Sequence, residues 1–179
     1  MAIKILSNPL KYIFIIFLSI GIFALGVGYF LSAPIQPHPK LDPKFSIIFL
    51  NNLKIHMKTI VDIFLSFGIA SIYFVWCQFF LVGVLIGGAR KSTGDFISSI
   101  SFFWIHGILE LVTVILTASI VPFILASIVS LILKKTDITL NLKKFFNKTL
   151  ILIGVLFILI FVSALLETFI APNFIIWNR

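Results

Sequence analysis

Charge is scarce in this chain of 179 residues. Asp, Glu, Lys and Arg make up 11% of it, whereas 60% of its residues are hydrophobic and the mean hydropathy is +1.20. Because a soluble domain covers its surface with about 25–35% charged residues, the composition excludes a soluble globular protein. Several uncharged runs have the length of about twenty residues that a helix needs to cross a bilayer. They predict a multi-pass membrane protein with short connectors.

Cysteine is almost absent as well. Cys77 is the only one, so the chain makes no internal disulfide and no cysteine metal cluster. His38, His56 and His106 are too scattered to indicate a zinc or haem site, and the sequence has no HExxH, GxSxG or phosphate-loop motif. We therefore expect no catalytic residue, no metal and no cofactor, and a protein that is not an enzyme.

The net charge of +8 does not indicate nucleic acid binding. The basic residues lie in the connectors between apolar runs instead of on one soluble face. Basic connectors beside membrane helices report their orientation and contact anionic head groups. The expected surroundings are therefore the lipid bilayer of the cell membrane and other membrane proteins, with no nucleic acid.

Five membrane spans are predicted, at about residues 12–31, 59–86, 96–113, 117–133 and 149–170. An amphipathic segment at 45–58 predicts an interfacial helix before the second span. The division of 96–133 depends on length, because one helix of these residues would be about 57 Å long against a hydrocarbon thickness of about 30 Å. The expected fold is an all-α polytopic helix bundle that forms a single transmembrane domain over residues 1–179.

Basic residues favour a cytoplasmic N-terminus. With five spans, nine Lys and Arg residues lie on the cytoplasmic side and five on the other, in agreement with the positive-inside rule. Four spans with the N-terminus outside give the same counts, so charge alone leaves both arrangements open. The length of 96–133 favours five.

Four polar residues are predicted to form an intramembrane cluster. His106 and Glu110 are four residues apart and share a helix face. Glu110 and Glu167 lie about 21 Å and about 27 Å along helices that are both expected to run outward, and Asp62 begins the second span near the same surface. The cluster either holds the bundle together, or contacts an ion, a proton or a ligand, or lies in the head-group zone with little effect.

Glycines predict close helix packing. Gly83 and Gly87 form a GxxxG pair, Gly107 follows His106, and Gly21 and Gly28 fall with Ala24 on one face of the first helix. Small residues at such spacings let two helix backbones approach each other. A homodimer is compatible with these faces.

Three segments are similar to a known family. "HGILEL" (106–111) resembles the His-Gly-x-x-Glu-Leu segment of the stage II sporulation protein M (SpoIIM) family, and "ALLETFIAP" (164–172) resembles the segment that closes the family's domain. "NNLK" (51–54) is a weaker match. The likeness extends over about residues 48–173, although the chain has Gln78-Phe79 and Val112 where the family often has Asn-Gly and Pro.

The resemblance implies a five-span membrane fold and a non-enzymatic component of a membrane complex. It would act in cell-envelope remodelling or sporulation, beside proteins that remodel peptidoglycan. Relatives of this family also occur in clusters for bacteriocin export and immunity. The alternative is therefore a transport or export/immunity component that works beside an ABC transporter, with His106, Glu110, Glu167 and Asp62 lining an intramembrane polar cavity.

Overall fold

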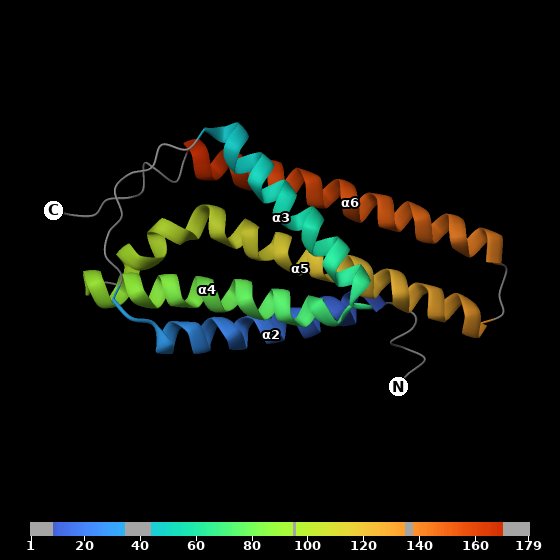
Figure 1. Cartoon of the computed structure of the whole chain (residues 1–179), viewed down its shortest axis with the longest axis horizontal. Coiled ribbons are helices and arrows are strands. Elements are labelled where there is room, and N and C mark those ends of the chain that lie inside the picture. Colours follow the sequence, from blue (N-terminus) through green and yellow to red (C-terminus); the bar gives the residue numbers. More distant parts are fainter. Residues whose placement is uncertain (1–8, 35–43, 95, 135–137, 170–179) are drawn as a thin grey trace.

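The computed structural model describes residues 9–34, 44–94, 96–134 and 138–169, and they form five helices without a strand (Figure 1). The all-α fold is thereby confirmed. The helices are α2 (Pro9–Leu31), α3 (Phe45–Leu65), α4 (Ile69–Thr93), α5 (Phe96–Lys134) and α6 (Ile138–Phe169).

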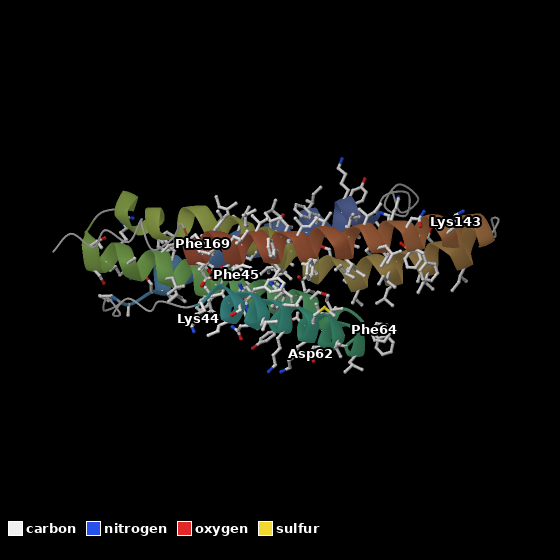
Figure 2. The ribbon with its side chains drawn as sticks, turned by 90° about the horizontal axis from the view of Figure 1, so that it is seen from above. Lys44, Phe45, Asp62, Phe64, Lys143 and Phe169 are labelled. Atoms are coloured by element: carbon white, nitrogen blue, oxygen red, sulfur yellow. The ribbon has the colours of Figure 1, made fainter. Side chains whose placement is uncertain are left out.

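Successive helices alternate in direction along the long axis of the bundle (Figure 1). α2, α4 and α6 run one way, and α3 and α5 run the other way. α3 begins beside the end of α6, where Figure 2 shows Phe45 and Phe169 together, and Lys143 lies at the opposite end of the molecule. The chain therefore passes along the bundle five times, so that α2 and α6 run in the same direction.

Four of these helices are long and apolar enough to cross a membrane, and the protein is a multi-pass membrane protein. The apolar stretches are Pro9–Leu31, Ile69–Thr93, Gly107–Ser130 and Phe145–Phe169. α3 is not among them, since it exposes Lys54 and Lys58 along its outer side. The helix predicted at 45–58 is present, but it packs against α5 and α6 within the bundle instead of lying only at the interface.

The span predicted at 59–86 is wrong, because the chain turns inside it. Phe67 and Gly68 have φ angles of 51° and 92°, and Gly68 donates its N–H to the carbonyl of Ile63 at 2.8 Å. A left-handed residue of this kind ends a helix, and glycine adopts it without strain. The turn contains apolar residues, and two of them, Phe67 and Ile69, are largely exposed. The sequence therefore resembles the middle of one span.

The division of 96–133 into two crossings is also wrong, because α5 is continuous from Phe96 to Lys134. The polar residues near the expected break find their hydrogen-bond partners inside the helix. Thr113, Thr117 and Ser119 donate their hydroxyls to carbonyls four residues earlier, at 2.6–2.8 Å. Every residue from 113 to 121 is buried, so the expected break lies in an enclosed part of α5.

The connector that follows α4 therefore lies at the other end of the bundle from the end predicted for it. α2 and α4 are parallel neighbours, since Gly21 meets Phe79 and Gly87 meets Tyr29. Arg90 and Lys91 at the end of α4 therefore share an end with the start of α3, whereas the five-span prediction placed these two segments on opposite sides. The chain still passes along the bundle five times, but the five segments differ from the predicted ones.

α5 lies between two hydrophobic clusters. One of its faces packs against α2 and α4 through Val114, Ile115 and Ala118. Another face contributes Leu116 and Ile120 to a cluster whose other buried members come from α6, with residues of α3 packed around it. Both halves of the bundle thus depend on the same stretch of one helix.

Glycines form the contact between α2 and α4, and the small-residue face predicted on the first helix is confirmed. Gly21, Ala24 and Gly28 are buried, and a Cβ added to Gly28 would collide with the carbonyl oxygen of Phe80. Gly83 and Gly87 face Leu25 and Tyr29 of the same chain. The GxxxG pair is used within the monomer, so it gives no support to a homodimer.

Gly28→Ala should destabilise the protein, because the added methyl group forces the α2 and α4 backbones apart. Overpacking of this kind costs about 1–3 kcal/mol. Gly26→Ala in the same helix is the control, since no atom lies within 4 Å of its added Cβ. The thermal unfolding midpoint in detergent should fall for Gly28→Ala and stay level or rise for Gly26→Ala. Equal midpoints would contradict the close α2–α4 contact.

The parallel arrangement of α2 and α4 predicts which sites share a side of the membrane. Lys44→Cys and Ser92→Cys, each in a Cys77→Ala background, should react with an impermeant maleimide from the same side. Lys143→Cys should react from the other side, because it lies at the far end of α6 (Figure 2). Labelling of Lys44→Cys and Ser92→Cys from opposite sides would restore the arrangement predicted from the sequence.

Candidate functional site: a polar cavity between four helices

Two of the four predicted cluster residues come together in the structure. Glu110 of α5 and Glu167 of α6 lie near enough for their charges to repel each other. They meet because α5 and α6 are antiparallel neighbours, with Phe123 stacked on Phe145 further along. The predicted route was different, since it placed both residues on helices that run outward together.

The other two predicted residues are not part of this pair. Asp62 is exposed on the outer side of α3 (Figure 2), near the turn into α4, and it does not line the cavity described below. His106 belongs to α5, but its side chain lies outside the described residues. Gly107 is buried in the same helix.

Glu110 lines a cavity of about 120 Å³ between α3, α4, α5 and α6. All four helices contribute polar side chains or apolar walls to it. The lining residues are Asn52, Ile55, His56, Phe74, Gln78, Glu110, Thr113, Val114, Ile160 and Ser163. A volume of this size exceeds the space of about 30 Å³ that one water molecule takes in the liquid. The cavity therefore has room for several waters or a small guest.

His56 is fixed on the α3 side of the cavity. It is 9% exposed, its Nδ1 lies 2.9 Å from the hydroxyl of Thr117 on α5, and its ring stands edge-on to Phe74 of α4. The hydroxyl of Thr117 also lies 2.8 Å from the carbonyl of Thr113. One histidine therefore ties α3 to both neighbouring helices.

Asn52 connects the cavity to Glu167. Its side chain lies close enough to the Glu167 carboxylate to stabilise its charge, and the amide nitrogen has this effect because a carboxylate only accepts hydrogen bonds. Asn52 also lines the cavity beside Glu110. The two carboxylates thus have different environments: Glu167 has an amide partner, and Glu110 faces the cavity.

Ser163 contributes a buried hydroxyl without a partner. The residue is 2% exposed, and its Oγ makes no hydrogen bond although the residue lines the cavity. A buried hydroxyl left unpaired costs about 1–3 kcal/mol. Within this fold it is therefore a group that a guest in the cavity would satisfy.

Most residues of this site were not predicted from the sequence. Asn52 and His56 are four residues apart and so share one face of α3, which is the signal that could have found them. Gln78, Thr113 and Ser163 offer no such signal, because single polar residues are common in membrane helices. Their meeting depends on how four helices pack, and that is a tertiary property.

The chemistry of the lining is that of oxygen and amide groups. Within the described part of the chain, no three His, Cys, Asp or Glu side chains form a group that could hold a metal ion. The cavity instead combines one carboxylate, two amides, two hydroxyls and one imidazole. Such a set binds through hydrogen bonds and through the hard oxygen contacts that alkali and alkaline-earth ions prefer.

Comparison with known proteins gives one match. A family model described as stage II sporulation protein M matches residues 13–172, which includes all the lining residues of the cavity. No curated protein and no solved structure matches the chain.

Thr117→Val should destabilise the protein, because His56 Nδ1 loses its partner while the shape of the side chain is kept. A buried polar group left unpaired costs about 1–3 kcal/mol, which a lower thermal unfolding midpoint in detergent would report. Ser119→Ala is the control, since that buried hydroxyl contacts only a carbonyl of its own helix. The bond between α3 and α5 has no stabilising role if Thr117→Val unfolds no earlier than Ser119→Ala.

Proposed function

Because the chain belongs to the stage II sporulation protein M family, with a match over residues 13–172, we propose that it is a non-enzymatic transport or export/immunity component of the cell membrane. Its polar cavity contacts an ion or small solute within the bilayer. The proposal depends on one observation, which is that Glu110 faces a cavity lined by polar side chains from four helices.

The position of Glu110 in the membrane makes this observation informative. It lies near one end of the apolar stretch Gly107–Ser130 and is half-buried in the bundle, where an ionised carboxylate needs a partner or water. A residue that only held the bundle together would be expected to have a partner, as Glu167 has in Asn52. Glu110 faces open space instead, so it fits a role in contacting a guest better than a role in holding helices together.

We further infer that the N-terminal end of the bundle faces the cytoplasm. Among the described residues, the basic ones near that end are Lys11, Lys134, Lys143, Lys144 and Lys148. Those near the other end are Lys44, Arg90 and Lys91. The larger group lies on the cytoplasmic side by the positive-inside rule. Moving Arg90 and Lys91 to the second group, and leaving out Lys54 and Lys58 on the outer side of α3, reduces the bias that the sequence predicted but keeps its sign.

Membership of the family supports a second candidate. The chain would then be a non-enzymatic component of a membrane complex for cell-envelope remodelling, beside peptidoglycan-remodelling proteins. Crosslinking in the native membrane followed by purification distinguishes the two. Recovery of a peptidoglycan-remodelling enzyme supports the second candidate, and recovery of an ABC transporter supports the first.

Glu110→Gln should abolish passage of the guest while keeping the fold, because glutamine preserves the shape of the side chain and removes its charge. Purified protein in liposomes would be assayed for uptake of ²²Na⁺ and ⁸⁶Rb⁺ and for proton flux with an enclosed pH dye. Loss of a contact to a charged group, worth about 1.5–3 kcal/mol, should lower the active flux at least tenfold.

Asp62→Asn is the matched control, since it removes an acidic charge that is exposed and outside the cavity. It should leave the flux unchanged. Wild-type liposomes that take up none of the three probes faster than empty ones would refute the transport proposal. Equal flux in Glu110→Gln and wild type would do the same.

A further inference from the structure

Ser163 differs from most other hydroxyl residues of the bundle. Nine described Ser and Thr residues donate their hydroxyl to a carbonyl three or four residues earlier in the chain. The buried hydroxyls of Ser71, Thr149 and Ser163 make no hydrogen bond, and of these three residues Ser163 is the one that lines the cavity. Since Ser163 lines the cavity, its oxygen is left for whatever the cavity holds.

Two further lining residues are left with acceptor atoms. Thr113 gives its only hydroxyl proton to the carbonyl of Leu109 at 2.6 Å, so its oxygen can offer only lone pairs. Asn52 stabilises the nearby Glu167 charge through its amide nitrogen, so its amide oxygen is the end left for the cavity. Together with the Glu110 carboxylate and the Ser163 hydroxyl, these groups supply oxygen acceptors from three helices, α3, α5 and α6.

We propose that this cavity is a binding site for a single alkali-metal cation of the size of Na⁺ or K⁺. The ion is held by the Glu110 carboxylate and by the oxygens of Asn52, Gln78, Thr113 and Ser163. The inference rests on the proposed function, and it names the class of guest. A bound cation neutralises Glu110 inside the membrane and satisfies the hydroxyl of Ser163.

The number of carboxylates favours a monovalent ion. Protein sites for Ca²⁺ take six to eight oxygen ligands and usually include several carboxylates, whereas Glu110 is the only carboxylate in this lining. Glu167 lies nearby and adds to the negative potential, but Asn52 stabilises its charge and it does not line the cavity. One carboxylate with neutral oxygens matches one positive charge.

Direct binding of ²²Na⁺ to purified protein in detergent tests the site. Scintillation proximity counting should give saturable binding that unlabelled NaCl displaces. KCl should displace the label as well. Choline chloride at equal ionic strength is the control salt and should not. Ser163→Ala removes one oxygen with little change in volume and should weaken binding about tenfold, as the loss of one good polar contact does. Glu110→Gln should remove it.

Ser119→Ala is the matched control, because Ser119 is equally buried but bonded to a carbonyl of its own helix and outside the cavity. It should bind ²²Na⁺ as the wild type does. The site is refuted if the wild type shows no saturable binding, if choline displaces the ion as well as Na⁺ does, or if Ser163→Ala and Ser119→Ala bind alike. Ser163→Ala keeps the test valid should Glu110→Gln fail to fold.

Binding and transport can fail separately. Saturable binding without flux in liposomes would keep the cation site and refute the transport role. The bound ion would then stabilise the bundle. Flux of protons that depends on Glu110 without ²²Na⁺ binding would keep the transport role and refute the cation site.

Discussion

Hydrogen-bond satisfaction without water is the constraint on which this fold depends. A lipid-facing helix offers its polar groups no solvent partner, so each group must find one in the protein. Hydroxyls along α2, α4, α5 and α6 return to carbonyls of their own helix. The turn between α3 and α4 obeys the same rule, since Ser66 both donates to Ile63 and accepts from Ala70. Ser71, Thr149 and Ser163 are the exceptions among the described side chains, and Ser163 is the one of them that lines the cavity.

The central position of α5 connects the stability of the bundle to its cavity. One face of this helix packs on α2 and α4, and another packs against α6 and α3. Glu110 and Thr113 lie at the end of this buried stretch that faces α3, so the same helix that joins the two halves also supplies the carboxylate. α3 completes the site because its polar face, with Asn52 and His56, turns inward and its lysines turn outward.

The sequence predicts the class of fold well, because apolar runs alone decide that the chain crosses a membrane. Boundaries inside those runs are less predictable. The break at Gly68 lies among apolar residues, and only a backbone angle distinguishes it from the middle of a span. The pair of Glu110 and Glu167 could be predicted because deep carboxylates are rare, although the expected helix directions were wrong. The positions of Gln78 and Ser163 in the cavity could not be predicted, since they depend on how four helices pack together.

The parallel arrangement of α2 and α4 also has an electrostatic consequence. The C-terminal end of a helix has a partial negative charge of about half an electron, and two such ends lie side by side here. Arg90 and Lys91 occupy this point, where Arg90 donates to the hydroxyl of Tyr29 and Lys91 to the carbonyl of Ser32. These two cations therefore neutralise a paired helix dipole. Their position would be required by the fold whichever side of the membrane it faced, so they are poor indicators of orientation.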